Sequence, residues 1–353
     1  MPDAPSSISV RDESPSALLR LCPAYAPTPL LDLTDLAAAL GVAQVLIKDE
    51  GRRPLGSFKA LGGVYAALRA LARAAGLSTA ALLDPARARA PLPALVCASD
   101  GNHGLAVAAA ARLAGAKARV FLPDVVPEAR IARVAGKGAD VTRIAGTYDE
   151  AVRAAAEAAR AEGALLIADT GENAADPVVA DVMAGYGVIA EEILAQRAAG
   201  GHRPPTHLFV QAGVGGLAAA MAEGLRSLVP QARIVVVEPE GAACVGAALA
   251  ARAIVTFPGA LETSAEMLSC GEASAPALAI LLRHRAEALA APEAALRAAP
   301  GFLRAHGGPA TTPSGAAGLA GLRLALADPA LAERLGLDGE SRVLLLATES
   351  APA

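Results

Sequence analysis

"HLFVQAGVGGLAAAMAEGL" (207–225) runs from a short apolar segment through a glycine turn into a helical pattern. The backbone N–H groups of Gly213, Val214, Gly215 and Gly216 are expected at a helix N-terminus, where they would bind a phosphate. The spacing from Gly213 to Ala218 also fits the dinucleotide fingerprint G-x-G-x-x-A, and Glu238 ends the next apolar run. Three interpretations remain open from this stretch: a mononucleotide-type phosphate site, an NAD site, or a turn without a ligand.

Short apolar runs alternate with long helical patterns along most of the chain. Most of these runs are apolar throughout, which is typical of strands buried on both faces of a mainly parallel sheet. Strands are predicted at 43–48, 94–99, 118–123, 140–144, 164–169, 207–212, 233–238 and 342–348, helices at 104–114, 148–162 and 216–228, and proline-rich linkers at 91–93 and 203–205. This pattern predicts an α/β protein with helices on both faces, and the number of strands favours two sheets over one.

A second polar turn, "CASDGNHG" (97–104), also lies between an apolar run and a helix. It contains Ser99, Asp100, Gly101, Asn102 and His103. Their N–H groups would form a site for a carboxylate or another anion. The alternative is an ordinary helix cap, but one cap needs one such residue and here four turn residues and a histidine follow one another.

Lysine is rare in this chain. Only Lys48, Lys59, Lys117 and Lys137 are lysines among the 31 basic residues, and the others are arginines. A lysine can form an imine with an aldehyde, whereas an arginine cannot. Lys59 follows a glycine turn in "GSFKA" (56–60), so we interpret it as a Schiff-base residue. An imine-forming lysine, an anion turn and a phosphate loop together indicate a pyridoxal-phosphate (PLP) site.

Composition excludes several other classes of function. A net charge of -4 and 3% aromatic residues give no reason to expect nucleic acid or an anionic membrane as a partner. The four cysteines lack metal-ligand spacing, so no metal is expected and a reducing compartment is favoured. Residues 1–16 lack the basic and apolar regions of a signal peptide, which predicts a cytoplasmic protein.

The chain resembles the fold-type II PLP enzymes, and within them most of all the diaminopropionate ammonia-lyase branch. The resemblance rests on "PTPL" (27–30), "KDEGRRPLGSFKALGG" (48–63), "ASDGNHG" (98–104), "DTGENAADPVVADVMAGYG" (169–187), "QAGVGGLA" (211–218), "VEPEGAAC" (237–244), "SCGEA" (269–273) and "LLLATE" (344–349). It implies a fold like that of the tryptophan synthase β subunit, with two open, twisted, mainly parallel sheets. Residues 1–65 and 187–353 would form a large cofactor domain, residues 66–186 a small domain, and the chain a homodimer.

The resemblance also assigns roles to residues of this sequence. Lys59 would hold PLP as a Schiff base, and Lys59, Asp100 and Asp169 would be the catalytic residues. The cofactor would be bound by Phe58, Lys59, Asn102, Gly213, Val214, Gly215, Gly216, Leu217 and Thr348, and the substrate by Ser99, Asp100, Gly101 and His103. A neutral hydroxyl at Thr348, facing the pyridine nitrogen, would favour β-elimination over transamination.

The implied function is α,β-elimination from an amino acid like 2,3-diaminopropionate, giving a 2-keto acid and ammonia. Two departures affect the substrate: "GENAADPVV" (171–179) lacks the bulky aromatics of the family, and Pro313 stands where an acidic residue is expected before "SGA". A dehydratase for threonine, serine or phenylserine is therefore the alternative. A β-replacement synthase or an NAD-dependent oxidoreductase is a more distant one.

Overall fold

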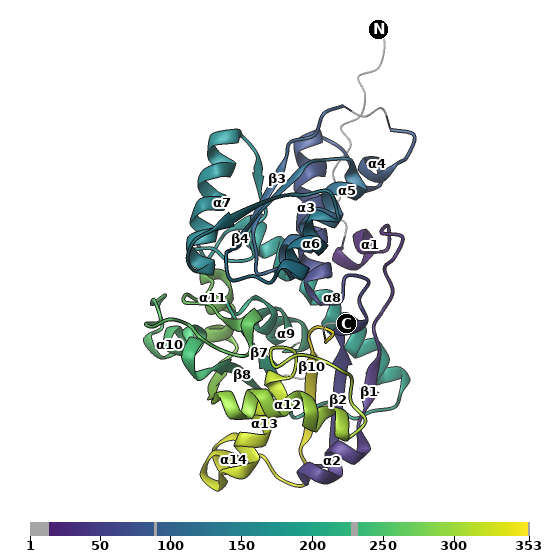
Figure 1. Cartoon of the computed structure of the whole chain (residues 1–353). Helices are drawn as coiled ribbons and strands as arrows, with labels where there is room; N and C mark the ends of the chain where they lie inside the picture. The colour runs from purple at the N-terminus through teal and green to yellow at the C-terminus, as the bar shows by residue number, and fades with distance from the viewer. Residues whose placement is uncertain (1–13, 88–89, 227–231, 352–353) are drawn as a thin grey trace.

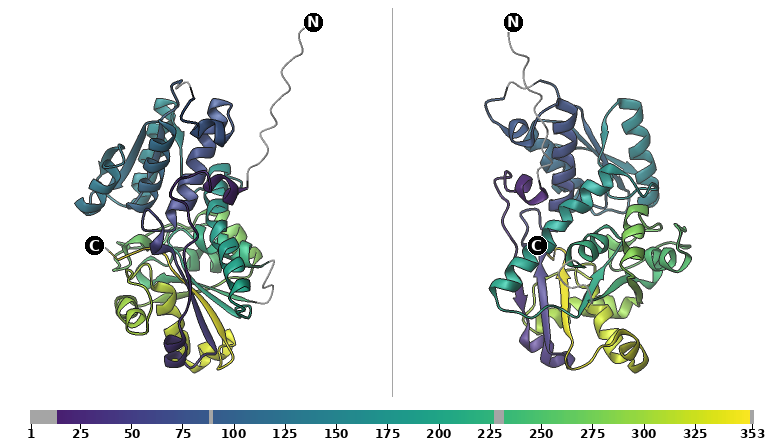
Figure 2. Two further views of the ribbon diagram at one scale, coloured as in Figure 1. Left: turned by 90° about the vertical axis from the view of Figure 1, so that its right-hand side faces the viewer. Right: turned by 180° about the vertical axis from the view of Figure 1, so that it is seen from behind.

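The strands form two sheets, one in the upper and one in the lower part of the molecule (Figure 1). The computed structural model describes residues 14–87, 90–226 and 232–351. Both views in Figure 2 keep the two sheets apart, with helices packed around each of them. The prediction of an α/β fold with two mainly parallel sheets is confirmed.

The larger sheet has six strands in the order β1-β2-β10-β7-β8-β9. Its strands are β1 (Leu30–Asp32), β2 (Gln44–Asp49), β7 (His207–Gln211), β8 (Arg233–Pro239), β9 (Glu287–Ala291) and β10 (Arg342–Ala347). Every neighbouring pair is parallel except β1 and β2. Alternate residues of one strand enter two different cores: Leu344 and Leu346 lie in one, and Val343 and Leu345 in the other. Both faces are therefore buried, which explains why these strands are apolar throughout.

The smaller sheet has four parallel strands in the order β5-β4-β3-β6. They are β3 (Leu95–Ala98), β4 (Ala118–Pro123), β5 (Asp140–Ile144) and β6 (Leu165–Leu166). These four strands all lie within the predicted small domain, 66–186. The domain boundaries themselves remain predictions, and both fall inside helices, in α3 (Lys59–Ala75) and in α8 (Pro177–Ala199).

The helices cover the sheets, and the two predicted anion loops lead into the first turns of two of them, α5 and α9. Beside α3 and α8, the longer ones are α5 (Asn102–Ala114), α7 (Tyr148–Glu162), α9 (Gly216–Arg226), α12 (Glu293–Ala305) and α13 (Ala317–Ala327). The shorter ones are α1 (Pro15–Leu19), α2 (Thr34–Leu40), α4 (Thr79–Leu83), α6 (Glu128–Ala135), α10 (Cys244–Ala251), α11 (Ala275–Arg283) and α14 (Pro329–Leu335), with 3-10 turns η1 (Glu50–Arg52), η2 (Glu240–Ala242) and η3 (Glu266–Leu268). Within the described ranges, no helix combines the length and apolar character needed to cross a membrane.

The strand predictions differ from the structure in two respects, and one helix prediction is tested only in part. Strands β1 and β9 were not predicted, because β1 has only three residues and β9, "EALAA", consists of residues that favour helices. The strand predicted at 164–169 is assigned only at Leu165–Leu166. The helix predicted at 216–228 is described to Arg226, and its last two residues lie outside the described residues.

Two glycines allow α3 and α8 to touch backbone to backbone. A Cβ atom on Gly62 would lie 2.4 Å from Cε1 of Tyr186, and one on Gly185 would lie 2.7 Å from the Cα of Gly62. No other residue type fits at this crossing without displacing a helix. The contact places the start of α3, with Lys59, beside the aromatic ring of Tyr186.

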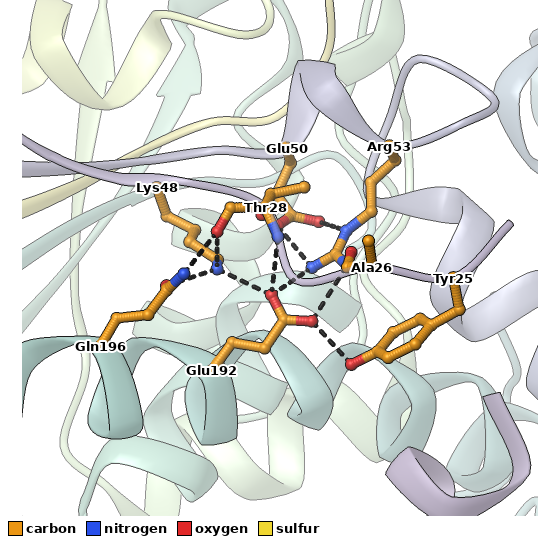
Figure 3. A network of polar contacts seen from close by, with 8 residues as sticks. All are labelled: Tyr25, Ala26, Thr28, Lys48, Glu50, Arg53, Glu192 and Gln196. Atoms are coloured by element: carbon orange, nitrogen blue, oxygen red, sulfur yellow. Dashed lines mark hydrogen bonds and ion pairs between the residues drawn. The ribbon is translucent and has the colours of Figure 1, made fainter. Parts of the chain in front are cut away.

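A buried network of charges ties α8 to the larger sheet (Figure 3). Lys48 of β2 is fully buried, and its Nζ lies 2.7 Å from Oε2 of Glu192. The Nη2 of Arg53 is also 2.7 Å from Glu192, and the Nε of Arg53 is 2.7 Å from Glu50. Thr28 donates a hydrogen bond of 2.6 Å to Glu50. Two cations and two carboxylates thus compensate one another out of water.

We expect Glu192→Gln to lower the free energy of unfolding by about 3 kcal/mol, because it leaves one buried cation without a partner charge. Urea denaturation followed by circular dichroism measures this. Glu162→Gln is the control: Glu162 pairs with Arg119 at 2.6 Å, but both side chains are exposed. Glu162→Gln should lower the free energy of unfolding by less than about 1 kcal/mol. Equal losses in the two variants would contradict a special role for the network.

The same pair of variants should differ in their dependence on pH. Burial alone would raise the pKa of Glu192, but hydrogen bonds and charges from Arg53 and Lys48 lower it below the ordinary value of 4.5. The stabilisation is therefore complete above pH 4.5 and is lost as the pH falls through the lower pKa of the folded state.

Candidate active site

The two predicted loops and Lys59 meet in one pocket between the two sheets, which we call the central pocket. Its lining combines residues from both sheets' helices and loops. Of the residues predicted from the sequence, it contains Phe58, Lys59, Ser99, Asp100, Asn102, His103, Asp169, Gly213, Val214, Gly215, Gly216, Leu217 and Thr348. Gly101 lies in the same loop but is not part of the lining. The structure therefore brings together residues that are up to 290 positions apart in the chain.

Lys59 is the first residue of α3, and the end of β10 fixes the turn before it. The N–H of Phe58 donates a hydrogen bond of 3.1 Å to the carbonyl of Thr348. The Nζ of Lys59 lies 5.5 Å from the centroid of the Phe58 ring and 5.9 Å from that of Tyr186. It forms an ion pair with Oδ2 of Asp169. Burial alone would lower the pKa of Lys59, but the Asp169 carboxylate raises it above the ordinary range.

Asp169 is held from its other side by a tyrosine that the sequence did not point to. The hydroxyl of Tyr148, at the start of α7, donates a hydrogen bond of 2.5 Å to Oδ1 of Asp169. Burial raises the pKa of Asp169, but the charge of Lys59 outweighs it and holds that pKa well below the usual range. Asp169 is thus an ionised carboxylate, 5% exposed, facing the central pocket.

Asp100 lies in the same pocket but differs in its protonation. Burial and the neighbouring Asp169 charge raise the pKa of Asp100 to about 7, although Lys59 acts in the opposite direction. One carboxyl group of the pocket is therefore charged throughout the neutral range, while the other changes its charge within that range. Such a divided pair is typical of acid and base groups in an active site.

The loop around Asp100 is shaped by the hydroxyl of Ser99. Its Oγ accepts hydrogen bonds of 2.8 Å from the N–H groups of both Gly101 and Gly104. The helix-cap alternative thus describes Ser99 itself, and the N–H of Gly101, with φ of +132°, is already used. The hydrogen bonds of the described backbone include none donated by Asp100, Asn102 or His103, so these three N–H groups are open to an anion.

The His103 side chain points into the protein. Its Nε2 lies 2.8 Å from the carbonyl oxygen of Ile167, and burial lowers its pKa, so the neutral ring donates to that oxygen. Its Nδ1 faces Gly63 of α3 and has no hydrogen-bond partner among the described residues. What His103 offers to a substrate is its backbone N–H.

The glycine loop leaves a row of unpaired donors at the start of α9. None of the described hydrogen bonds is donated by the N–H groups of Val214, Gly215, Gly216 or Leu217. Gly215 adopts a φ of +95°, which a residue with a side chain rarely tolerates. A Cβ on Gly213 would lie 3.0 Å from Sγ of Cys270, so the backbone itself lines the pocket at this point.

Thr348 presents a hydroxyl whose proton is free to donate. The Nε2 of Gln211 donates to Oγ1 of Thr348 at 3.2 Å, so the hydroxyl is an acceptor in that contact. Its own hydrogen remains available for the pocket. A neutral donor of this kind suits an unprotonated pyridine nitrogen.

Glu349, the next residue, was also missed. Its carboxylate accepts hydrogen bonds of 2.5 Å from Asn102 and from Thr312. The clue to Glu349 was its place directly after Thr348. Two of the four tyrosines of the chain, Tyr148 and Tyr186, line the central pocket. The rarity of tyrosine was the signal that the sequence offered for them.

Glu238 belongs to the dinucleotide fingerprint of the NAD alternative, and the structure gives its carboxylate another role. It accepts hydrogen bonds of 2.7 Å from the N–H groups of both Val245 and Gly246 at the start of α10. Glu238 is 1% exposed, and burial raises its pKa to about 8. It does not line the central pocket, and it is not placed to bind a nucleotide there.

The donors and side chains of the central pocket fit PLP. Four open N–H groups at a helix N-terminus suit its phosphate, and a primary amine at Lys59 suits its aldehyde. Phe58 and Asn102 line the same space as Thr348. Among the described residues, no group of three metal-ligating side chains is present. The individual role of each predicted site residue, and the expectation of no metal, stay predictions.

Comparisons with known proteins agree with this fit. Diaminopropionate ammonia-lyase of Salmonella typhimurium is 34% identical over 93% of this chain and 86% of its own length. Two crystal structures of the Escherichia coli enzyme, one with an aminoacrylate-PLP azomethine reaction intermediate and one with D-serine, align with a TM-score of 0.85 and 29% identity. They cover 98% of this chain, and 89% and 90% of the respective crystallised chains.

A second group of relatives matches a shorter part. L-threonine dehydratase of Escherichia coli is 32% identical over 65% of this chain and 39% of its own length. The model of the family described as pyridoxal-phosphate dependent enzyme matches residues 21–349. The chain therefore belongs to the pyridoxal-phosphate dependent enzymes.

Proposed function

We propose that this PLP enzyme is an ammonia-lyase for an amino acid like 2,3-diaminopropionate, which it converts to a 2-keto acid and ammonia by α,β-elimination. The observation that carries the proposal is the buried, ionised Asp169. Its ion pair is with Lys59, and that amine cannot remain a free cation while it reacts with the cofactor or accepts a proton. A buried carboxylate needs a new cation at that moment, and a β-ammonium group of the substrate supplies one.

The relatives support the same activity. A relative matched over 93% of this chain carries the name diaminopropionate ammonia-lyase, and one aligned structure is in complex with D-serine. Serine has a hydroxyl where diaminopropionate has its β-amino group. We propose that this chain distinguishes the two by the charge of that group.

PLP, when bound, supplies an imine for the substrate amine and a conjugated ring that takes up the electron pair left at Cα. Lys59, Phe58, Asn102, Thr348 and the 213–217 loop would hold it. The open N–H groups of Asp100, Asn102 and His103 bind the substrate carboxylate and orient Cα.

Proton transfer is then the work of side chains. The amine of Lys59, released by the incoming substrate, takes the Cα proton of an L-amino acid. Asp169 stabilises the leaving β-ammonium group, and the hydrogen bond from Tyr148 keeps its carboxylate in place. The enamine that leaves the pocket hydrolyses in water to the keto acid and ammonia.

Asp100 extends this chemistry to the opposite stereoisomer. Because its pKa is raised to about 7, it accepts a proton far more readily than an ordinary aspartate does. We propose that its carboxylate takes the Cα proton of a D-amino acid. In its protonated form it donates a proton to the leaving group instead.

A dehydratase for threonine, serine or phenylserine is the second candidate. It is supported by the match to threonine dehydratase and by the small side chains of residues 171–179, where the sequence lacks bulky aromatics. Homodimer formation, cytoplasmic location and the absence of a nucleic-acid partner are also proposed, on the family resemblance and the composition described above.

The proposed function is tested by a keto-acid release screen with D- and L-forms of diaminopropionate, serine, threonine and phenylserine. We expect pyruvate from diaminopropionate at a kcat/KM at least about tenfold above that for serine. Lys59→Ala is the control and should lower the rate roughly 10³-fold with every substrate. Release from threonine or phenylserine alone would support the dehydratase and overturn the lyase.

Asp169→Asn should remove the preference for a charged leaving group. The amide has the same shape but no charge to stabilise a β-ammonium group, so kcat/KM for diaminopropionate should fall about 10²-fold. The value for serine should fall less than about tenfold. A parallel loss for both substrates would show that Asp169 does not recognise the β-substituent.

Activity on the D-isomer should depend on the ionisation of Asp100. A base acts when it is deprotonated, so kcat/KM for the D-isomer should rise with pH up to about 7 and then level off. Asp100→Asn should lower this value about 10²-fold and change the value for the L-isomer far less. An unchanged ratio of D- to L-activity in this variant would assign the proton transfer to another group.

A further inference from the structure

The carboxylate of Glu349 occupies a place in the central pocket that none of the proposed catalytic steps uses. It is 8% exposed and follows Thr348 at the end of β10. Its Oε2 accepts a hydrogen bond of 2.5 Å from Nδ2 of Asn102, and its Oε1 accepts one of 2.5 Å from the hydroxyl of Thr312. Glu349 also forms a β-bridge with Ser57, two residues before Lys59. One residue thus contacts three segments of the cofactor site.

The two donors fix the orientation of the Glu349 carboxylate and favour its ionised form. The hydroxyl of Thr312 accepts the N–H of Gly315 at 2.9 Å, so its own hydrogen is directed to Glu349. Asn102 donates to the other oxygen, so the ionised carboxylate is the form that satisfies both donors. An amide nitrogen carries two hydrogens, and the second one of Asn102 meets only a weak acceptor, the Sδ of Met267 at 3.5 Å, which a hydroxyl oxygen can replace.

Glu349 also bears on the departure from the family pattern at Pro313. The segment "TTPSGA" (311–316) lacks the acidic residue expected there, and the structure instead directs the hydroxyl of Thr312 at Glu349. An acid is therefore present on this side of the pocket, but it comes from the end of β10.

We propose that Glu349 is a positioning residue of the cofactor site: it holds the Asn102 amide so that its second N–H can turn from the Met267 sulfur to the ring hydroxyl of PLP, and it adds one negative charge to the site. The inference rests on the cofactor role of Asn102 in the proposed function. Lys59, Asp100 and Asp169 line the same pocket, and the charges of Arg130 of α6 and Glu266 of η3 act on Glu349. Burial raises the pKa of Glu349, and the hydrogen bonds from Thr312 and Asn102 oppose this.

Glu349→Gln tests the inference, because glutamine keeps the shape but offers one acceptor oxygen to two donors. The Asn102 amide must then turn, and the charge is lost. Two quantities are measured: the pH midpoint of the visible absorbance band of the purified holoenzyme, and the Kd of the apoenzyme for PLP. We expect the midpoint to fall by about one pH unit, since a nearby anion favours the protonated imine, and the Kd to rise about tenfold.

Glu266→Gln is the matched control. It removes a neighbouring carboxylate that pairs with Arg130 at 2.7 Å and is not bonded to Asn102 in the structure. It should shift the pH midpoint by less than about 0.3 unit and change the Kd for PLP less than about twofold. A Glu349→Gln variant that behaves like Glu266→Gln would overturn the proposal.

A double-mutant cycle with Asn102→Ala separates positioning from a general effect on the fold. Once Asn102 is absent, Glu349→Gln should change the Kd for PLP less than about twofold, because its contact is already lost. If the two substitutions change the Kd for PLP independently, so that their fold-changes multiply in the double variant, the inference is overturned. Should Glu349→Gln fail to fold, Glu349→Asp replaces it in the cycle, since its shorter side chain keeps the charge but withdraws from Asn102.

These readouts need no substrate, so they separate the two proposals. A chain that binds PLP and shows the coupling, but releases no keto acid, would overturn the proposed function and leave the role of Glu349 intact. A working lyase without the coupling would do the opposite.

Discussion

The backbone contact between α3 and α8 is the constraint on which the site depends. Neither Gly62 nor Gly185 could carry a side chain at this crossing, because the added atom would overlap the other helix. The crossing sets Lys59, at one end of α3, against Tyr186 of α8 and within reach of Asp169. Further along α8, Glu192 enters the buried charge network. Helix α8 therefore positions the reactive amine of Lys59 and also carries Glu192 of the buried charge network.

Electrostatics in the central pocket follow from what each carboxyl group touches. Asp169 has a cation and a hydroxyl donor, so it stays charged although it is buried. Asp100 has no direct side-chain partner among the described residues, and burial together with the Asp169 charge raises its pKa to about 7. Glu349 is held by two neutral donors. The three acids of the central pocket thus have different partners, and each is suited to a different task.

Local sequence predicted the parts of the site that depend on local chemistry. The fold was predictable because parallel strands buried on both faces appear in the sequence as continuous apolar runs. The two anion loops were predictable because glycines and polar turn residues follow such runs directly. Tyr148 and Glu349 were not, because their roles arise from contacts with Asp169 and Asn102, which are distant in sequence. Strand β9 was missed for the same reason: its helix-favouring residues are held extended by pairing with β8. The turn-closing hydrogen bonds of Ser99 could not be told from a ligand contact in the sequence, since a hydroxyl that closes a turn looks the same there as one that binds a ligand.

The burial of Lys48 bears on how the cofactor finds its residue. An aldehyde reacts with any accessible primary amine, so every exposed lysine on a PLP enzyme competes for it. Here Lys48 is sealed in an ion pair, and only Lys117 and Lys137 remain as other lysine amines. With arginine at nearly every other basic position, the surface offers few lysines for stray adduct formation. Because most of its basic residues are arginines, the chain has few side chains other than Lys59 that can form an imine with the cofactor's aldehyde.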